Sequence, residues 1–321
     1  MRPRALAITG PTASGKTAIG LALARRLGAE IVSMDSRQVY RGMDVGTDKV
    51  TREERRGVPH FGLDLVDPDE SYSAGRWARA AREWIDEIEG RGHTPLLVGG
   101  TGFFLRTLLR PIFREPLLDP ARRDALRRWM DARSLGDLDR WLTSLDPDRA
   151  AVARAGGRQR VSRALEVALL SGRPLSWWHR AAEPDGEPVP CLVVCLEVHR
   201  DEMDRRIDAR VSQMVERGFV DEVRALLDQG YATDAPGMTG TGYRAIASML
   251  RGETTLDEAL DQVRHQTRRY ARRQLTWFRN QLPPETLRIE AGHPQDDILD
   301  RIESAWREAR HTPVPAPTRI S

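Results

Sequence analysis

The chain has 321 residues, of which 40% are hydrophobic and 30% are charged, as in a globular protein that folds in water. This length accommodates one large α/β domain with an insertion, or two domains. The 50 Lys and Arg residues nearly balance 47 Asp and Glu residues, so the net charge of +3 only weakly indicates a nucleic-acid partner. No apolar run approaches the roughly 20 residues of a membrane span, and the N-terminus lacks a signal-peptide pattern. We therefore expect a cytoplasmic protein with no membrane contact.

The first motif fits the phosphate-binding pattern G-x-x-x-x-G-K-[ST] and consists of Gly10, Pro11, Thr12, Ala13, Ser14, Gly15, Lys16 and Thr17. The apolar run 5–9 before it predicts a strand, and the Ala- and Leu-rich stretch 18–27 after it predicts a helix. In such a loop the backbone N–H groups surround a phosphate at the helix N-terminus. Lys16 would meet a terminal phosphate, and the Thr17 hydroxyl would reach a Mg²⁺ ion. The motif predicts that the chain binds a di- or triphosphate.

A second predicted strand, 30–34, ends in a polar segment made of Asp35, Ser36, Arg37 and Gln38. Polar groups beyond the carboxyl end of such a strand point into the ligand crevice, so Asp35 is a candidate acid–base residue. The alternative is that Asp35 caps the following turn. Further along, Lys49 could meet a phosphate or be a solvated surface charge. His60, in a short strand and turn, could be a ligand or an acid but is more often structural.

The buried strand predicted over 95–98 runs into Gly99, Gly100, Thr101 and Gly102. An ordinary P-loop ATPase places a magnesium-binding Asp at the end of such a strand. Its replacement here argues against simple ATP hydrolysis. Thr101 could instead form a hydrogen bond with a phosphate oxygen or a substrate.

Residues 114–182 carry helical patterns, many arginines and no strand pattern, which predicts a helical insertion. Two basic features stand out there. One is a helix surface formed by Arg122, Arg123, Arg127 and Arg128; the other is a helix that opens with Gln159, Arg160, Val161, Ser162 and Arg163. Each could contact nucleic acid or could simply be a solvated helix face.

The chain returns to the sheet with a strand over 193–198, followed by a long amphipathic helix. Arg206 and Arg210 flank its apolar stripe and could reach a phosphate or lie along the surface. Residues 239–244 are expected to be a flexible loop. The last strong feature is a basic helix near 268–279, whose outward side chains suit a nucleic-acid backbone: Arg272, Arg273, Thr276 and Arg279. The Pro-rich tail, 311–321, is expected to be disordered.

In order and spacing, five patterns resemble the bacterial tRNA dimethylallyltransferase family: GPTASGKT, DSRQVY, GGTG, QRVSR and RRQLTWFR. The resemblance extends from about residue 5 to about residue 290. It implies a P-loop NTPase-like parallel sheet flanked by helices. The core would comprise 1–113 and 183–310, and a helical insertion at 114–182 would contact tRNA. One departure is His60-Phe61, where the family often has two consecutive histidines.

The resemblance also implies an activity. Members transfer a dimethylallyl group from dimethylallyl diphosphate to N6 of the adenosine 3′-adjacent to the anticodon, in tRNAs that read codons starting with U. The matching phosphate loop would hold the donor's diphosphate with Mg²⁺ on Thr17, and Arg210 would contact that diphosphate. Asp35 would be the general base, with Ser36 and Gln38 holding the flipped adenine and Thr101 at the substrate channel.

The remaining tRNA contacts implied by the resemblance come from Arg37 and Arg123, from Gln159, Arg160, Val161, Ser162 and Arg163, and from Arg272, Arg273, Thr276 and Arg279. We expect a monomer without an obligate protein partner. Three other enzymes remain as alternatives: a small-molecule kinase, a nucleic-acid-stimulated ATPase, and an isopentenyltransferase acting on free AMP or ADP. A tRNA-binding module without activity would leave Asp35 and Lys16 without a purpose.

Overall fold

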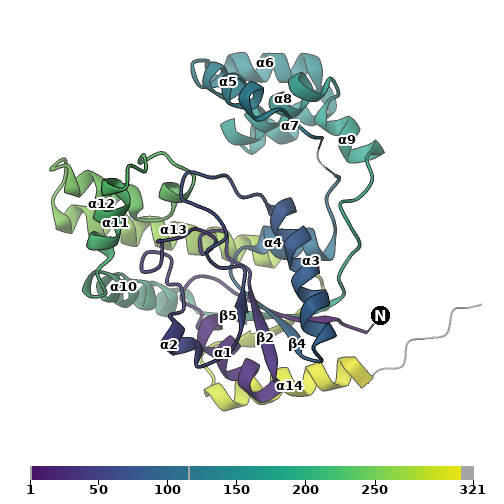
Figure 1. The fold of residues 1–321 in the computed structure, drawn as a ribbon, viewed down its shortest axis with the longest axis vertical. Coiled ribbons are helices and arrows are strands. Elements are labelled where there is room, and N and C mark those ends of the chain that lie inside the picture. Colours follow the sequence, from purple (N-terminus) through teal and green to yellow (C-terminus); the bar gives the residue numbers. More distant parts are fainter. Residues whose placement is uncertain (1, 115, 312–321) are drawn as a thin grey trace, which may run out of the picture. The chain divides into compact units, whose positions relative to one another are not determined.

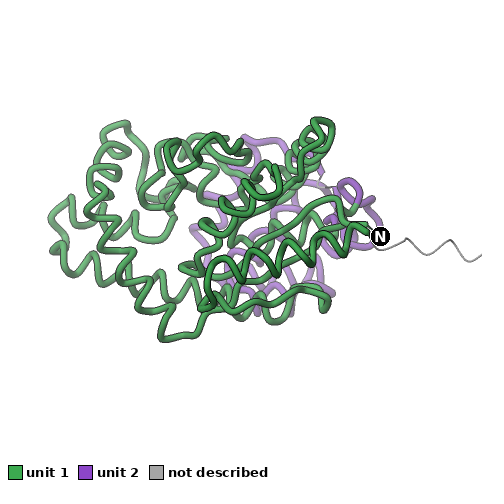
Figure 2. Tube along the Cα trace, turned by 90° about the horizontal axis from the view of Figure 1, so that it is seen from below, with its two compact units in different colours: residues 1–110, 188–321 green, residues 111–187 purple. Residues whose placement is uncertain are grey.

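The structure, a computed structural model, describes residues 2–114 and 116–311. The chain divides into two compact units, coloured separately in Figure 2. One unit is Pro111–Glu187, and the other combines the chain before and after it. The expected insertion, 114–182, lies inside the first of these. The tail expected to be disordered lies outside the described residues from 312 onward.

The larger unit is built on a parallel six-stranded sheet with the strand order β3-β2-β4-β1-β5-β6 (Figure 1). This confirms the predicted parallel α/β sheet. The central strand pairs with a neighbour on each side, so that Ala7 faces Leu97 on one and Val193 on the other. The strands are β1 (Ala5–Thr9), β2 (Ala29–Ser33), β3 (His60–Phe61), β4 (Thr94–Val98), β5 (Cys191–Glu197) and β6 (Leu287–Glu290).

Alternate residues of β1 enter different cores, because successive side chains of a strand point to opposite faces of the sheet. Leu6 and Ile8 pack with α1 (Lys16–Leu27) and α14 (Gln295–His311). Ala5 and Ala7 pack with α3 (Ala74–Gly90) and α4 (Gly102–Leu109), whose Trp77 and Phe104 rings stack. The sheet is therefore covered by helices on both faces (Figure 1).

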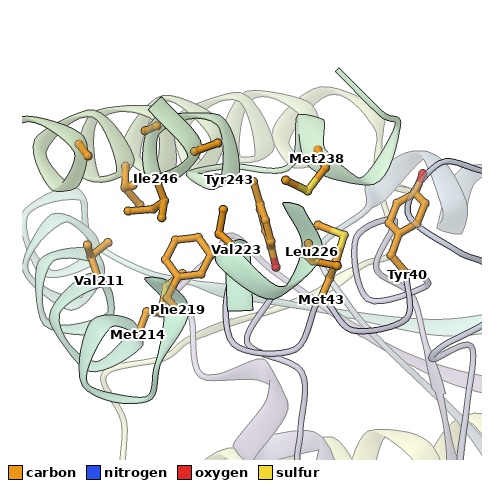
Figure 3. Packing of buried hydrophobic residues seen from close by; sticks show 14 of the residues in the cluster. Tyr40, Met43, Val211, Met214, Phe219, Val223, Leu226, Met238, Tyr243 and Ile246 are labelled. Atoms are coloured by element: carbon orange, nitrogen blue, oxygen red, sulfur yellow. The ribbon is translucent and has the colours of Figure 1, made fainter. Parts of the chain in front are cut away.

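A third core packs the helices that follow β5 in the chain against the segments after β2 and β3 (Figure 3). Phe219 and Tyr243 are fully buried at its centre, with their rings in edge contact. The segment 239–244 was expected to be a flexible loop, but a helix begins at Tyr243, because that ring is needed to fill this core. The helices here are α10 (Arg200–Glu216), α11 (Phe219–Asp228), α12 (Tyr243–Leu250) and α13 (Leu256–Gln281), with the short α2 (Arg52–Arg55) and a 3₁₀ turn, η1 (Gly237–Thr239).

The smaller unit consists of helices joined by turns, with one isolated antiparallel bridge between Phe113 and Pro184 among its described residues. Asp119 and Ser134 cap two of its helices by accepting hydrogen bonds from backbone N–H groups. The side chains of Leu138, Leu142 and Leu165 are fully buried in its separate core. Its helices are α5 (Pro120–Asp131), α6 (Leu135–Leu145), α7 (Pro147–Ala155), α8 (Arg158–Ser171) and α9 (Leu175–Ala181).

Candidate active site

The phosphate loop connects β1 to α1. Gly15 precedes α1 with φ of 80°, a left-handed conformation that glycine adopts without strain. The buried Ser14 Oγ has no hydrogen-bond partner among the described residues, which leaves it available to a bound anion. Lys16 Nζ lies 3.2 Å from the Pro11 carbonyl oxygen. Desolvation lowers the pKa of Lys16 to about 8, against the attraction of Asp35.

Asp35 and Thr101 follow different strands, but a hydrogen bond joins the two segments that carry them. The Asp35 carboxylate accepts from the Arg37 backbone N–H at 2.8 Å. The Ser36 backbone N–H donates to Thr101 Oγ1 at 2.9 Å. This is the arrangement expected for parallel strands whose carboxyl ends meet at one edge of the sheet.

A cavity of about 190 Å³ brings some of the predicted residues together, although Lys16, Thr17 and Thr101 are not among the residues that line it. Thr12 of the phosphate loop, Asp35 and Arg210 all line it. Tyr270 and Arg273 reach it from α13. Desolvation raises the pKa of the Tyr270 phenol to about 12, and the Asp35 charge adds to this effect. The cavity thus places a residue of the phosphate loop, Arg210 and Arg273 around the Asp35 carboxylate.

The two arginines of α10 differ in what they reach. Arg210 Nη1 lies 3.4 Å from Asp48 and lowers the pKa of Lys16 through its charge, so it is near that ammonium. Arg206 pairs with Glu202 at 2.7 Å and donates to the Ala13 carbonyl oxygen at 3.3 Å. Arg210 is therefore the one that faces the cavity, while Arg206 supports the phosphate loop from outside.

The side chain of Gln38, expected to hold an adenine, is engaged within the protein. Its Oε1 accepts from the Ser33 hydroxyl, and its Nε2 donates to the carbonyl oxygens of Thr47 and Asp48. Both donors of the amide are thus used to position the loop at Thr47, which lines the cavity. Arg37 also has internal partners, since its guanidinium donates to the Pro236 carbonyl and to Thr239.

The structure overturns the expectation for Lys49 and favours one of the two alternatives for His60. Lys49 is neither free for a phosphate nor a solvated surface charge, because it is buried and lies 2.6 Å from both Asp44 and Asp64. Those carboxylates come from separate turns, which is why the sequence did not reveal the ion pairs. His60 contacts the Val58 carbonyl through Nδ1 at 2.8 Å, and burial lowers its pKa, as for a structural neutral histidine.

Some of the arginines expected to face outward from α13 form ion pairs with acidic side chains of α10. Arg272 lies 3.3 Å from Asp204, and Arg268 pairs with Asp208. Arg273, Thr276 and Arg279 are exposed, as expected. The acidic partners were hidden from the sequence because they lie about sixty residues earlier in the chain.

In the smaller unit, a buried carboxylate binds several of the arginines that were expected to form a basic surface. Glu166 accepts from Nε of Arg123 and Nε of Arg127, each at 2.8 Å, and from Arg163. These arginines are held by the protein rather than spread over one free face. Val161 is fully buried, so its side chain packs in the core rather than facing a partner. Ser162 is half-buried, whereas Gln159 and Arg160 are exposed.

Three polar residues near the cavity were missed by the sequence reading as functional candidates. Glu222 accepts from the backbone N–H groups of 44–46 and from the Tyr243 hydroxyl. Gln274 bridges two loops, and Tyr270 lines the cavity. The sequence did place Gln274 on the packed face of a helix, and a polar side chain in that position indicates a buried hydrogen-bonding role. Glu222 carried no such indication, since most of its partners are backbone groups.

Two family models of isopentenyl-transferring enzymes match this chain. The family model described as IPP transferase matches residues 38–281, and that of isopentenyl transferase matches residues 3–64. The tRNA dimethylallyltransferase of Geobacter metallireducens is 42% identical, over 94% of this chain and 97% of its own length. That of Thermomicrobium roseum is also 42% identical, over 96% and 93%.

Solved structures agree. The tRNA isopentenylpyrophosphate transferase of Bacillus halodurans is 36% identical, with a TM-score of 0.67 over 95% of this chain and 97% of its own. A eukaryotic dimethylallyltransferase acting on tRNA, 24% identical, has a TM-score of 0.80 over 98% of this chain and 81% of its own, and supports the fold. The sheet flanked by helices is thus the expected P-loop NTPase-like fold. With the family model matching most of the chain and relatives aligning over nearly all of it, this protein belongs to the IPP transferase family.

Proposed function

We propose that this chain is a tRNA dimethylallyltransferase. It transfers a dimethylallyl group from dimethylallyl diphosphate to N6 of the adenosine 3′-adjacent to the anticodon, in tRNAs that read codons starting with U, and releases diphosphate. Family membership supports this activity. The observation that carries it is the shared cavity, in which Asp35 lies with Thr12 of the phosphate loop and with Arg210.

The phosphate loop would hold the donor. Backbone N–H groups of Gly15 to Thr17, the Lys16 ammonium and the Arg210 guanidinium would supply positive charge where the diphosphate leaves. Among residues 2–114 and 116–311, no three His, Cys, Asp or Glu side chains gather as a metal site. The exposed Thr17 hydroxyl and the orphaned Ser14 hydroxyl fit a site in which the diphosphate itself provides most ligands to Mg²⁺. When bound, Mg²⁺ would neutralise charge on the leaving diphosphate.

The acceptor would enter from the side of Asp35. Adenine N6 is a weak nucleophile because its lone pair is delocalised into the ring. Its attack forms the N6–C1 bond while the C1–O bond breaks and the electron pair leaves with the diphosphate. The N6 proton passes to the Asp35 carboxylate, a general-base role worth about 10²–10⁴-fold. The adenine must leave its stack to reach this position.

The tRNA would be held by charge and shape. Exposed side chains available for it are Gln159 and Arg160 in the smaller unit and Arg273, Thr276 and Arg279 on α13. Arg123 would contribute through the guanidinium edge that lies outside its pair with Glu166. No helix in the described ranges is long and apolar enough to cross a membrane. We propose that the enzyme acts as a monomer on cytoplasmic tRNA.

A transfer assay tests this function. Purified protein, Mg²⁺ and labelled dimethylallyl diphosphate are mixed with unmodified tRNA that reads a U-initial codon. Parallel samples replace tRNA with AMP, or replace the donor with ATP. Label at the adenosine after the anticodon is expected. Label in AMP alone would identify a free-nucleotide enzyme, and ATP consumption without transfer would favour the kinase or ATPase alternative. Asp35→Asn should slow transfer by at least about 10²-fold with tRNA affinity nearly unchanged.

A further inference from the structure

One side chain connects the phosphate loop to the loop that carries Thr101. Gln274, on α13, is buried with 7% of its surface exposed. Its Oε1 accepts from the Thr12 backbone N–H at 2.9 Å, and its Nε2 donates to the Gly100 carbonyl oxygen at 2.8 Å. The two loops follow adjacent strands, β1 and β4, so a single amide bridges the edge of the sheet where the site lies.

The fit around this amide is close. A Cβ atom on Gly100 would lie 2.5 Å from Gln274 Nε2 and 3.5 Å from Lys16 Cε. One turn along the same helix, Trp277 covers Gly102 so closely that a Cβ there would lie 2.3 Å from the ring. The loop is thus held against α13 on both sides of Thr101. These contacts leave the loop little freedom to move relative to the phosphate loop.

The contacts form a continuous path between the two halves of the site. Thr12 is tied to Gly100 through Gln274, and Thr101 follows Gly100 in the chain. Thr101 Oγ1 in turn accepts from the backbone N–H of Ser36, which is next to Asp35. The path therefore joins the donor's phosphate loop to the carboxylate that faces the acceptor.

We propose that Gln274 is a positioning residue. It sets the separation between the phosphate loop and the hydrogen-bonded segments that carry Asp35 and Thr101, and so aligns donor and acceptor for in-line attack. The inference rests on the proposed function. The bridge needs an acceptor and a donor on one planar group, and the Gln274 amide supplies both. Asparagine is one methylene shorter, and methionine of similar volume offers neither. Alignment is valuable because misplacement by about 1 Å can cost 10²-fold in rate.

The first test separates alignment from binding and from folding. Gln274→Met is compared with Gln281→Met, an exposed glutamine on the same helix. Three quantities are measured: the melting temperature, the Kd for dimethylallyl diphosphate with Mg²⁺, and the single-turnover transfer rate at saturating donor and tRNA, below the melting temperature. For Gln274→Met we expect a rate about 10- to 100-fold lower, with the donor Kd changed less than about threefold. Gln281→Met should match the unaltered chain.

A folded Gln274→Met protein with a rate within twofold of the unaltered chain would overturn the inference while leaving the proposed function intact. A rate loss matched by an equal loss of donor affinity would also overturn it, because the residue would then act on binding. If the unaltered chain transfers no label to tRNA, the proposed function fails and this inference fails with it.

A double-mutant cycle tests the path through Gly100. Gly100→Ala should displace the Gln274 amide and slow transfer about tenfold or more. In a Gln274→Ala background the added methyl group has room, so Gly100→Ala should cause little further loss. Independent effects would instead multiply, and multiplication of the two slowdowns would refute the shared path.

Discussion

Replacing Glu166 by glutamine should destabilise the smaller unit selectively. Glu166 is 2% exposed, and its carboxylate accepts hydrogen bonds from Arg123, Arg127 and Arg163. Burial opposes ionisation, but the hydrogen bond from Arg127 and the three positive charges outweigh it and hold the pKa of Glu166 below its usual value of 4.5. At neutral pH the carboxylate is therefore charged, and its loss leaves three guanidinium groups without their common partner.

The expected cost follows from the exposure of those partners. Removing one member of a buried ion pair typically costs about 3–5 kcal/mol. Here the arginine side chains are 33%, 41% and 27% exposed, so water takes over part of their solvation when the carboxylate is removed. Glutamine also keeps one acceptor oxygen. We expect a loss of about 2–3 kcal/mol, which corresponds to a melting temperature lower by about 10–20 °C for a unit of this size.

Calorimetry of the full chain measures this loss, because the smaller unit has its own core and should melt separately. The control is Asp148→Asn, which breaks an exposed pair with Arg180 and should cost less than about 1 kcal/mol. Because the folded pKa of Glu166 lies below its unfolded value, the deficit of Glu166→Gln should be complete above pH 4.5 and shrink at lower pH. Equal melting of the two variants at pH 7 would refute this account of the cluster.

Three further perturbations address the larger unit. Because desolvation lowers the pKa of Lys16 to about 8, affinity for dimethylallyl diphosphate should fall about tenfold per pH unit above that value. In Lys16→Arg the affinity should stay level, and parallel pH profiles of the two proteins would contradict this. Glu222→Gln removes one acceptor oxygen from the backbone N–H groups of 44–46 and should lower the free energy of unfolding in urea by about 1–3 kcal/mol. An unchanged midpoint of urea unfolding would show that the carboxylate is unimportant. Arg273→Gln should reduce the salt dependence of tRNA binding by about 0.7–0.9 in slope, whereas Arg301→Gln on α14 should not; equal slopes would make Arg273 a solvated charge.

Local pattern sufficed to predict the elements that carry the site. Apolar runs bounded by glycine or polar segments located β1 and β4 to within a residue, because these strands are largely buried and consist mostly of apolar residues. By contrast, β6 was not predicted. Only Ile289 is buried in it, and it is a strand because β5 offers an open edge for pairing. That cause lies nearly a hundred residues away and leaves no local pattern.

The site was predictable where one residue type has one chemical use. The phosphate loop depends on glycine and lysine at fixed spacing, so its sequence identifies its structure. Gln38 could equally hold a base or hold a loop, and the choice depends on the carbonyl groups of Thr47 and Asp48 that the fold brings to it. Amide and hydroxyl groups are ambiguous in this way because they both donate and accept hydrogen bonds.

The arginines show how charge density in a sequence overstates a binding surface. Arg123 and Arg272 lie in basic clusters, yet each is paired with an acidic residue from another helix, Glu166 and Asp204. A guanidinium group with five donors can keep a carboxylate on one edge and still offer another edge to a phosphate. Such an arginine reaches a phosphate with its side chain already ordered, so less conformational entropy is lost on binding. If these arginines contact tRNA as proposed, the acidic partners fix the direction of that contact, and removing a partner should weaken tRNA binding even though it makes the protein more positive.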